Sequence, residues 1–376
     1  VAWAFAKTAA AEEGLFRAVA REAAARAGEF GPQGLCNLAW SFATVSLHSP
    51  GLLRAVAAAA LAGLPGFAPQ GLQNLVWAFA KLGLHDRDLF GAVAISAAAK
   101  VKEFTPQGMS NLVWAFAAAL ARDRLDLFRA VAPHAILRIK EFSPQGLSNV
   151  AWAFARLGLA DARLLRAAAG RAAAGMRGFT PQGMANLAWA FGTLSADDTA
   201  LAPALLHEAA RQLARFGPQE LCGLAWSLAK LRRGEAGILG SIADEAIAKA
   251  ANLAPKDLSS LAWAFAELRA REPGLLRALA AGAAARMPGF EPQALANLAW
   301  AFAHLGAGGA GLLRAAAARA CLLVEDFTPQ GLANVAWAFA ACAAKDAALL
   351  RALGAEAAGR LRACGLQELA NLAWAF

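Results

Sequence analysis

The sequence predicts an all-α protein, an α-solenoid (superhelix) of about ten 37-residue helix–turn–helix repeats. Two observations lead to this prediction: tryptophan recurs at a fixed period, and Leu and Ala around it follow helical spacing. Successive gaps are 37 residues, with a single gap of 38. The tryptophans are Trp3, Trp40, Trp77, Trp114, Trp152, Trp189, Trp226, Trp263, Trp300, Trp337 and Trp374. Composition alone cannot produce such regularity, so the chain is a repeat array.

The first helix of each repeat, helix A, carries the tryptophan. The clearest unit reads F-T-P-Q-G-L-A-N-V-A-W-A-F-A over residues 327–340. Thr328 stands where an N-cap hydroxyl binds free backbone N–H groups, and Pro329 suits the first helical position because it has no N–H to lose. Gly83, Gly158 and Gly306 are expected to end their helices. Helix A therefore runs from the proline to about six residues past the tryptophan.

Helix B is expected in the second apolar stretch of each repeat, such as residues 311–316. The extra residue of the 38-residue gap falls before Leu127, in the loop between the two helices, where an insertion disturbs packing least. One helical pair cannot bury its apolar face alone, so neighbouring repeats must stack. We expect residues 1–376 to form one continuous helical array. Because the chain begins and ends beside a repeat tryptophan, we expect it to be a fragment of a longer chain.

Charge and polarity narrow the partners. The formal net charge is +9, with 27 arginines and 9 lysines, which favours an acidic partner such as nucleic acid. The longest uncharged stretch, residues 30–53, contains Pro, Gln, Asn and His in a soluble-helix pattern, so no membrane partner is expected. The five cysteines form no C-x-x-C pair and lie near no histidine at zinc-ligand spacing, so neither metal nor cofactor is expected. Cys36 and Cys222 are interpreted as small buried fillers.

Helical geometry separates two faces of helix A. With the tryptophan as position 0 and 100° per residue, the apolar positions −5, −2, +2 and +5 fall within an arc of about 80°. In one repeat these are Leu72, Leu75, Phe79 and Leu82, which we expect in the core. The opposite arc holds glutamine at −7, asparagine at −3, the tryptophan and a variable residue at +4. Helix A is expected to line the inner surface with this arc.

A fixed polar stripe beside one variable residue is typical of a modular reader of single-stranded RNA, in which two or three side chains per repeat contact one nucleotide. The candidate RNA-binding residues are the asparagines at −3 and the cations at +4. They are Asn37, Asn74, Asn111, Asn149, Asn186, Asn297, Asn334, Asn371, Lys7, Lys81, Arg156 and Lys230. The alternative for the asparagines is structural: a hydrogen-bond ladder between repeats, or a bond to a neighbouring backbone carbonyl.

Two further rows have their own alternatives. The tryptophans can stack on bases, but alanines at −4, −1 and +3 favour packing between repeats. Arginines recur on helix B, either as a solvated outer face or paired with local acids, or as phosphate contacts. They are Arg17, Arg54, Arg129, Arg166, Arg277, Arg314 and Arg351.

The motif F-T-P-Q-G-L-A-N-L-A-W-A-F-A resembles the heptatricopeptide and octotricopeptide repeats of organellar RNA-binding proteins. It is also similar to repeats of FAST-kinase-like and RAP-domain proteins, and of repeat subunits in the mitochondrial RNA-editing substrate-binding complex. The resemblance covers essentially the whole chain. It implies a mitochondrial or plastid protein acting in RNA processing, RNA stability or ribosome assembly, with single-stranded or ribosomal RNA and other ribonucleoprotein subunits as partners.

Two adjacent repeats depart from this motif. The seventh has Gly223 for asparagine and Leu228 for phenylalanine, and the eighth has Lys256 and Ser260 in place of glutamine and asparagine. These repeats either read no base or mark a break in the binding register.

No enzyme is predicted. The sequence lacks G-x-G-x-x-G, G-x-x-x-x-G-K, H-E-x-x-H and G-x-S-x-G motifs. The histidines, spread over unrelated repeat positions, are His48, His85, His134, His207 and His304. No small-molecule substrate is expected either. A protein–protein scaffold without RNA contact remains the alternative function, and it would place apolar residues at the variable positions.

Overall fold

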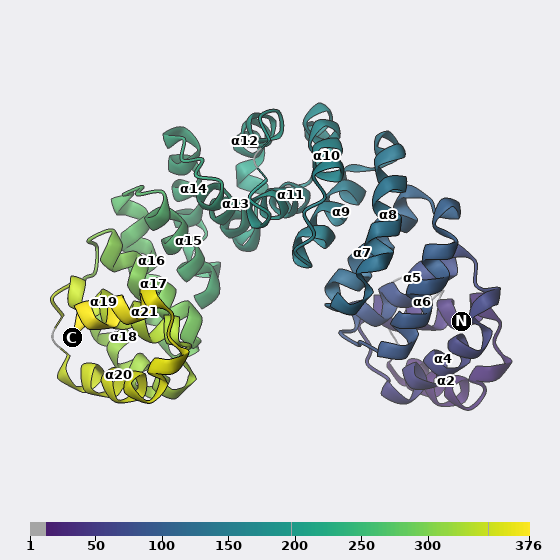
Figure 1. The fold of residues 1–376 in the computed structure, drawn as a ribbon, viewed down its shortest axis with the longest axis horizontal. Coiled ribbons are helices and arrows are strands. Elements are labelled where there is room, and N and C mark those ends of the chain that lie inside the picture. Colours follow the sequence, from purple (N-terminus) through teal and green to yellow (C-terminus); the bar gives the residue numbers. More distant parts are fainter. Residues whose placement is uncertain (1–12, 197, 345) are drawn as a thin grey trace. The chain divides into compact units, whose positions relative to one another are not determined.

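The structure, a computed structural model, describes residues 13–196, 198–344 and 346–376. This part of the chain is entirely helical, with twenty α-helices and no strand, which confirms the all-α prediction (Figure 1). The chain divides into two compact units, Val1–Leu205 and Leu206–Phe376, and each is described by itself. Helix pairs follow one another through both units, as expected of an α-solenoid.

The A helices are thirteen residues long, apart from the last, which has ten. They are α3 (Pro32–Thr44), α5 (Pro69–Lys81), α7 (Pro106–Ala118), α9 (Pro144–Arg156), α11 (Pro181–Thr193), α13 (Pro218–Lys230), α15 (Pro255–Glu267), α17 (Pro292–His304), α19 (Pro329–Ala341) and α21 (Leu366–Ala375). Proline occupies the first position of all but α21. The Thr105 hydroxyl accepts a hydrogen bond from the Gly108 N–H at 3.0 Å, and Ser143, Thr180 and Thr328 cap their helices in the same way. The expected N-caps are confirmed.

The A helices end earlier than expected, four residues past the tryptophan instead of six. At +6 the backbone turns into the left-handed region in nine repeats. Gly83, Gly158 and Gly306 adopt φ of +69°, +74° and +61° there, which confirms them as helix ends. The other six repeats place a residue with a side chain at +6, with φ of +50° to +55°. They are Ser46, Leu120, Ser195, Arg232, Arg269 and Ala343.

The B helices alternate with the A helices. They are α2 (Glu13–Ala25), α4 (Pro50–Gly63), α6 (Arg87–Ala99), α8 (Leu125–Leu137), α10 (Ala162–Ala174), α12 (Leu201–Gln212), α14 (Ala236–Ala248), α16 (Pro273–Ala285), α18 (Ala310–Leu322) and α20 (Ala347–Arg360). Six residues separate α7 from α8, where five separate α5 from α6, so the extra residue lies in the A–B loop as expected. A short 3₁₀ helix, η4 (Arg122–Arg124), takes up this insertion.

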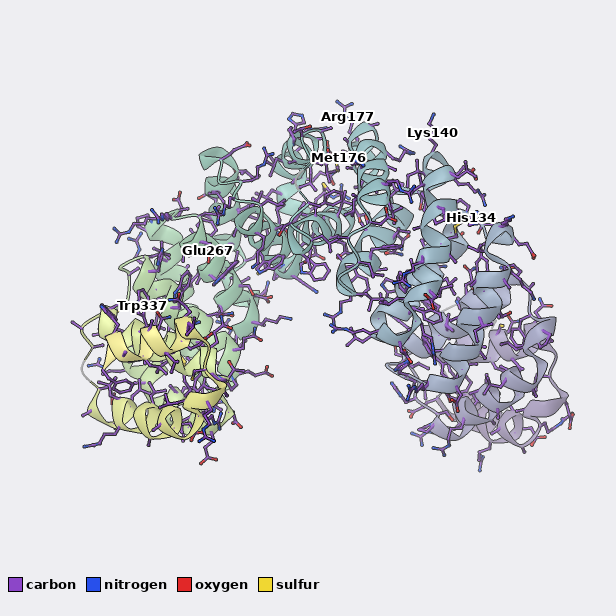
Figure 2. All side chains as sticks on the ribbon, viewed as in Figure 1. His134, Lys140, Met176, Arg177, Glu267 and Trp337 are labelled. Atoms are coloured by element: carbon purple, nitrogen blue, oxygen red, sulfur yellow. The ribbon has the colours of Figure 1, made fainter. Side chains whose placement is uncertain are left out.

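A single 3₁₀ turn follows each B helix. These turns are η1 (Ala27–Glu29), η2 (Leu64–Gly66), η3 (Val101–Glu103), η5 (Ile139–Glu141), η6 (Met176–Gly178), η7 (Leu213–Arg215), η8 (Ala250–Asn252), η9 (Met287–Gly289), η10 (Val324–Asp326) and η11 (Leu361–Ala363). Figure 2 shows Lys140 and Arg177 of two such turns projecting from the ends of α8 and α10, while Met176 is buried. The turns redirect the chain toward the next A helix.

The core lies between the A and B rows of each unit. Within each unit, A helices pack on the next A helix and B helices on the next B helix. The predicted core arc of α5 is confirmed: Leu72 and Leu75 are fully buried, and Phe79 and Leu82 are 2% and 5% exposed. Burial of this arc leaves the opposite side of helix A facing away from helix B.

Candidate nucleic-acid interface

The side of the A helices opposite the core is named the helix-A face, and it consists of positions −7, −3, 0 and +4. In α5 these are Gln70, Asn74, Trp77 and Lys81. Gln70 and Lys81 are exposed, while Asn74 and Trp77 are half-buried. None of the four packs into the core, in agreement with the predicted separation of faces.

The asparagines at −3 lie on this face in both units. Asn37 is exposed, and the others are half-buried: Asn74, Asn111, Asn149, Asn186, Asn297, Asn334 and Asn371. The Asn371 side chain accepts a hydrogen bond from Gln367 Nε2 at 3.0 Å. Within the described residues, the side chains of the other seven make no hydrogen bond with the protein. The expected alternative of a structural ladder between repeats is therefore not seen, and these amides are available to a ligand.

Several tryptophans along the face contact the tryptophan of the next repeat, one pair stacked and the others tilted. The ring centroids of Trp114 and Trp152 lie 6.4 Å apart with 30° between the planes, and those of Trp152 and Trp189 lie 6.3 Å apart. In the second unit, the Trp337 and Trp374 centroids are 6.1 Å apart. The rings thus pack between repeats, as the neighbouring alanines indicated, and all of these indoles are half-buried except the exposed Trp374.

The variable +4 residues flank the indoles. Lys81 and Arg156 are exposed on the face. Lys230 Nζ lies 5.5 Å from the Trp226 ring centroid and 5.3 Å from that of Trp263, a cation–π arrangement with two rings. Lys7 lies outside the described residues.

The arginine row of helix B points away from this face and is exposed throughout. Arg17 pairs with Glu13, and Arg129 Nη1 lies 3.0 Å from Asp126 Oδ1. Arg54 and Arg314 make no ion pair within the described residues. The row therefore fits a solvated outer surface with local pairs, and such exposed pairs contribute little to stability.

A second set of cations, which the sequence did not single out, joins successive repeats. Lys100 Nζ, at the end of α6, donates to the carbonyl oxygens of Phe67 at 2.8 Å and Pro65 at 3.2 Å in the preceding repeat. The equivalent residues, which donate to the corresponding turns, are Arg138, Lys249, Arg286 and Arg360. In the sequence, each of these residues is a cation that stands fourteen positions before the tryptophan of the following A helix. These charges bind the fold's own carbonyls, so the net charge overstates what is available to an anion.

Position −4 also joins neighbouring A helices. Cys36 Sγ lies 3.2 Å from the Gly71 carbonyl oxygen, and Ser148 Oγ donates to Gly183 O at 3.0 Å.

Burial raises the pKa of the Cys36 thiol to about 12. Burial, followed by the nearby Asp257, also raises the pKa of Cys222. Both thiols are thus protonated small fillers, as predicted, and no redox or nucleophilic role follows from them.

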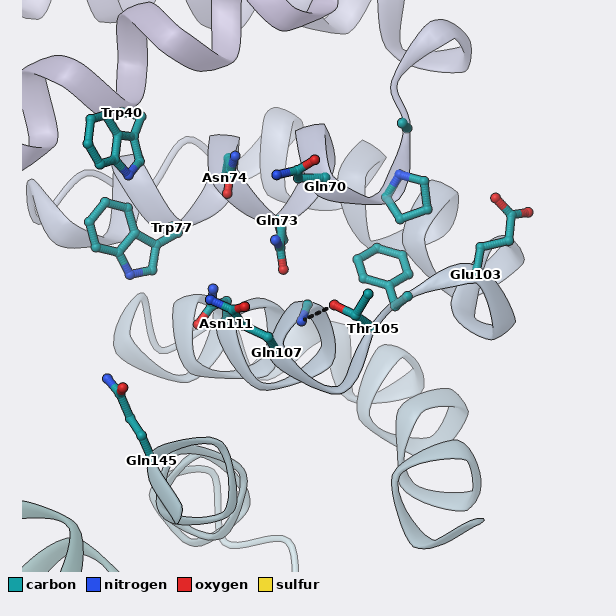
Figure 3. A pocket seen from close by; sticks show the side chains of 14 residues that line it. Trp40, Gln70, Gln73, Asn74, Trp77, Glu103, Thr105, Gln107, Asn111 and Gln145 are labelled. Carbon is teal, nitrogen blue, oxygen red and sulfur yellow. Dashed lines mark hydrogen bonds between the residues drawn. The ribbon is translucent and has the colours of Figure 1, made fainter. Parts of the chain in front are cut away.

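A pocket of about 640 Å³ opens on the helix-A face of the first unit, between α5 and α7 (Figure 3). Trp40 and Trp77 line it on one side, and Glu103 is its only ionisable lining residue. Six carboxamides line it: Gln70, Gln73, Asn74, Gln107, Asn111 and Gln145. The pocket thus gathers Asn74 and Asn111 from adjacent repeats, together with the glutamines at −7.

Gln73 was missed by the sequence reasoning. It occupies position −4, where the other repeats hold Cys, Ser or Ala. Its side chain is 8% exposed, and its buried Oε1 atom has no hydrogen-bond partner. In the sequence, Gln73 stands out as a large polar residue at position −4, which small residues occupy in the other repeats.

Other kinds of site have less support. Among the described residues, no three His, Cys, Asp or Glu side chains gather in a way that could hold a metal ion. Within the same part of the chain, no helix is both long and apolar enough to cross a membrane. The helix-A face remains the principal candidate site.

The fold and this face together define a helical-repeat protein. A family model described as "RNA-editing substrate-binding complex 6 protein" matches residues 1–273. The chain belongs to this family, because the match covers more than half of its length. This bears out the resemblance to repeat subunits of the RNA-editing substrate-binding complex.

Two other comparisons add little. No curated protein matches the sequence. A solved chain described as "Homology model of the full-length AP-3 complex in an intermediate open conformation" aligns with 93% of this chain and 78% of its own length, with a TM-score of 0.33 and 10% identity. A likeness at this level supports no argument about fold or function.

Proposed function

We propose that this protein binds single-stranded RNA on its helix-A face and acts in mitochondrial RNA processing as part of a ribonucleoprotein complex. The observation that carries the proposal is the row of unpartnered asparagine amides, seven in the described residues. An amide that neither supports the fold nor packs in the core is free to bind the edge of a base.

The neighbouring positions supply the other contacts that RNA requires. Lys81 lies two helical turns from Asn74 on one face, and Arg156 has the same relation to Asn149. An exposed cation there can bind a phosphate while the amide binds a base. The partly exposed indoles offer surfaces on which bases stack. If each repeat takes one nucleotide, the footprint is on the order of ten nucleotides.

The family supports the cellular role. Its description names an RNA-editing substrate-binding complex, which fits a mitochondrial protein with RNA and protein partners. Nothing comparable favours a plastid. We further propose that the repeats are of the heptatricopeptide or octotricopeptide kind, and that the protein acts by binding rather than by catalysis, without a cofactor.

The test removes cations from one face at a time. The first variant combines Lys7→Ala, Lys81→Ala, Arg156→Ala and Lys230→Ala. The control removes the same charge from helix B by Arg54→Ala, Arg166→Ala, Arg277→Ala and Arg314→Ala. Both variants should keep the helical circular-dichroism signal of the parent, because all the described positions lie outside the core arc.

Binding to a random RNA pool is then titrated at several salt concentrations. The helix-A variant should bind more weakly, and its salt slope should fall by about 3, since each lost phosphate contact on a single strand contributes about 0.7. The control should bind like the parent. Equal affinity of the folded helix-A variant and the parent would refute the proposal and favour a protein–protein scaffold.

A further inference from the structure

We infer that the pocket between α5 and α7 is a binding site for an adenine base, with Gln73 as the residue that binds the edge of the ring. This inference rests on the proposed RNA-binding function and goes further, because it assigns a base to one place on the helix-A face. The α5–α7 junction would then differ from the other repeat junctions of the first unit.

The lining of the pocket excludes a phosphate site. No lysine or arginine lines it, and the one ionisable lining residue, Glu103, would repel an anion. The carboxamides and indoles instead suit a neutral planar ring, which can stack on an aromatic face and bind amides at its edge. The pocket therefore fits the base of a nucleotide, with the phosphates outside it.

The two indoles that line the pocket, Trp40 of α3 and Trp77 of α5, are free to receive a ring. Trp114 stacks on Trp152, which in turn contacts Trp189 at a tilt. Trp40 and Trp77, which line the pocket, make no such ring contact with any described residue. Figure 3 shows both side chains at one end of the pocket, on the same side as the amides of Asn74 and Asn111. A base entering here would supply the stacking partner that these two indoles lack.

Gln73 supplies a polar group for the edge of the ring. Its Oε1 accepts no hydrogen bond, and a buried acceptor left unpaired destabilises the fold. The atom lies against Gly108, where an added Cβ would approach it to 2.9 Å. Glycine at 108 thus provides the space that the Gln73 amide occupies.

Rotation of the Gln73 amide about its last torsion would satisfy both of its ends. The side chains of Cys36 and Ser148, at the same repeat position, donate to the carbonyl 35 residues further on. For Gln73 that carbonyl belongs to Gly108, so a rotated amide would bring Nε2 toward it and turn Oε1 toward the pocket. The oxygen would then accept a hydrogen bond from a donor on a ligand in the pocket.

Adenine matches this requirement. Its N6 amino group donates to a carboxamide oxygen and its ring nitrogens accept from a carboxamide N–H, the pairing by which Asn and Gln bind adenine. Uracil can also pair with a carboxamide, through its N3–H and a carbonyl oxygen, so the preference for adenine over uracil rests on the stacking area of the ring. The roomy pocket also suits a purine, which stacks over a larger area than a pyrimidine.

The first measurement uses nucleosides as probes. The parent protein is labelled with ¹⁵N-glutamine, and the Gln73 side-chain resonance is identified as the one absent from Gln73→Ala. Adenosine should shift this resonance in a saturable manner, whereas uridine and inorganic phosphate should leave it in place. Equal shifts with uridine, or no shift with adenosine, would overturn the inference.

The second measurement uses fluorescent ten-nucleotide RNAs, oligo(A) and oligo(U). Gln73→Ala should weaken oligo(A) binding by about 2- to 10-fold, the range of one hydrogen bond, and leave oligo(U) binding unchanged. Four other repeats hold alanine at this position, so the variant should fold. Ser148→Ala, which changes the same position two repeats away and outside the pocket, should bind both RNAs like the parent.

The two measurements separate this inference from the proposed function. If the parent binds RNA but Gln73→Ala keeps the full preference for oligo(A), the pocket assignment is wrong and the function stands. If adenosine shifts Gln73 and neither RNA binds, the base site stands and the proposed RNA function is wrong.

Discussion

The junctions α5–α7 and α13–α15 share a core design but differ on the helix-A face. In the first, Asn74 and Asn111 meet at a carboxamide-lined pocket. In the second, Gly223 and Ser260 replace the asparagines, and the rings of Trp226 and Trp263 contact each other at a tilt, with centroids 6.5 Å apart. Lys230 then lies over both rings. At α5–α7 the asparagine amides are present and Trp77 contacts no other ring among the described residues. At α13–α15 the amides are missing and both indoles are engaged.

The residues that a repeat needs to fold are therefore distinct from those that vary on its helix-A face. Leu75 at one junction and Leu224 at the other are both fully buried at position −2. Apart from the tryptophan, which packs between repeats, the positions of the helix-A face can vary because they do not support the core. The loss of asparagine in two adjacent repeats is therefore a change of binding surface within an intact fold.

The largest expected effect tests whether the two junctions do share a core. Phe79→Ala in α5 and Leu228→Ala in α13 truncate the same position, +2, where both side chains are buried. Each should lower the free energy of unfolding by roughly 2–5 kcal/mol, because each leaves a cavity. Urea titrations followed by circular dichroism measure this. A loss below 1 kcal/mol at α13 alone would show that the degenerate repeats do not rely on the same core.

The next effect concerns affinity. Gly223→Asn and Ser260→Asn together restore the missing amides, and each should raise RNA affinity by about 2- to 10-fold if it gains one hydrogen bond. Asn74→Ala and Asn111→Ala should lower affinity by a similar factor. Fluorescence anisotropy on one RNA serves for all four. An unchanged affinity in the restored protein would mean that Lys230 over the indoles, and not the missing asparagine, closes this junction.

A smaller effect tests the left-handed +6 position at the two junctions. Gly83→Ala should destabilise the protein by about 1 kcal/mol, since φ of +69° strains a residue with a Cβ. Arg232→Gly, where φ is +53°, should stabilise it by about 0.5–1 kcal/mol, because the relief of strain exceeds the added entropy of the unfolded chain. Thermal melting followed at 222 nm would detect both, and shifts of the same sign would contradict the account.

The smallest effect concerns Lys230. Lys230→Ala should destabilise the second unit by about 0.5–1 kcal/mol, the range for an exposed cation–π contact. Lys81→Ala, at the same repeat position but over no indole, should change stability by less than about 0.5 kcal/mol. Differential scanning calorimetry of the two variants compares them directly. Equal losses would show that the cation–π geometry contributes nothing of its own.

The sequence was sufficient for features encoded within one repeat. Thr105 and Pro106 identify a helix start because capping depends on residues a few positions apart. The core arc of Leu72, Leu75 and Phe79 follows from helical periodicity alone. Both can be read without knowing how repeats contact one another.

Features that depend on contacts between repeats could not be read in this way. The bond from Lys100 to the carbonyl of Phe67 spans 33 residues, and nothing local distinguishes such a lysine from a solvated one. Gln73 becomes important only because its neighbour across the junction is Gly108. For the asparagines at position −3, the regular spacing also allowed a hydrogen-bond ladder between repeats. The structure shows no such ladder among the described residues, and the amides lie on the helix-A face.

The spacing of the stacked tryptophans sets a condition on any strand that follows them. Along Trp114, Trp152 and Trp189 the centroids advance by 6.4 and 6.3 Å per repeat. A stacked nucleic-acid strand advances by about 3.4 Å per nucleotide, so the indole period is close to twice that rise. A strand in register with the indoles must either be stretched, with one unstacked nucleotide per repeat, or remain stacked, with two. The number of nucleotides protected per repeat therefore reports the backbone conformation of the bound RNA.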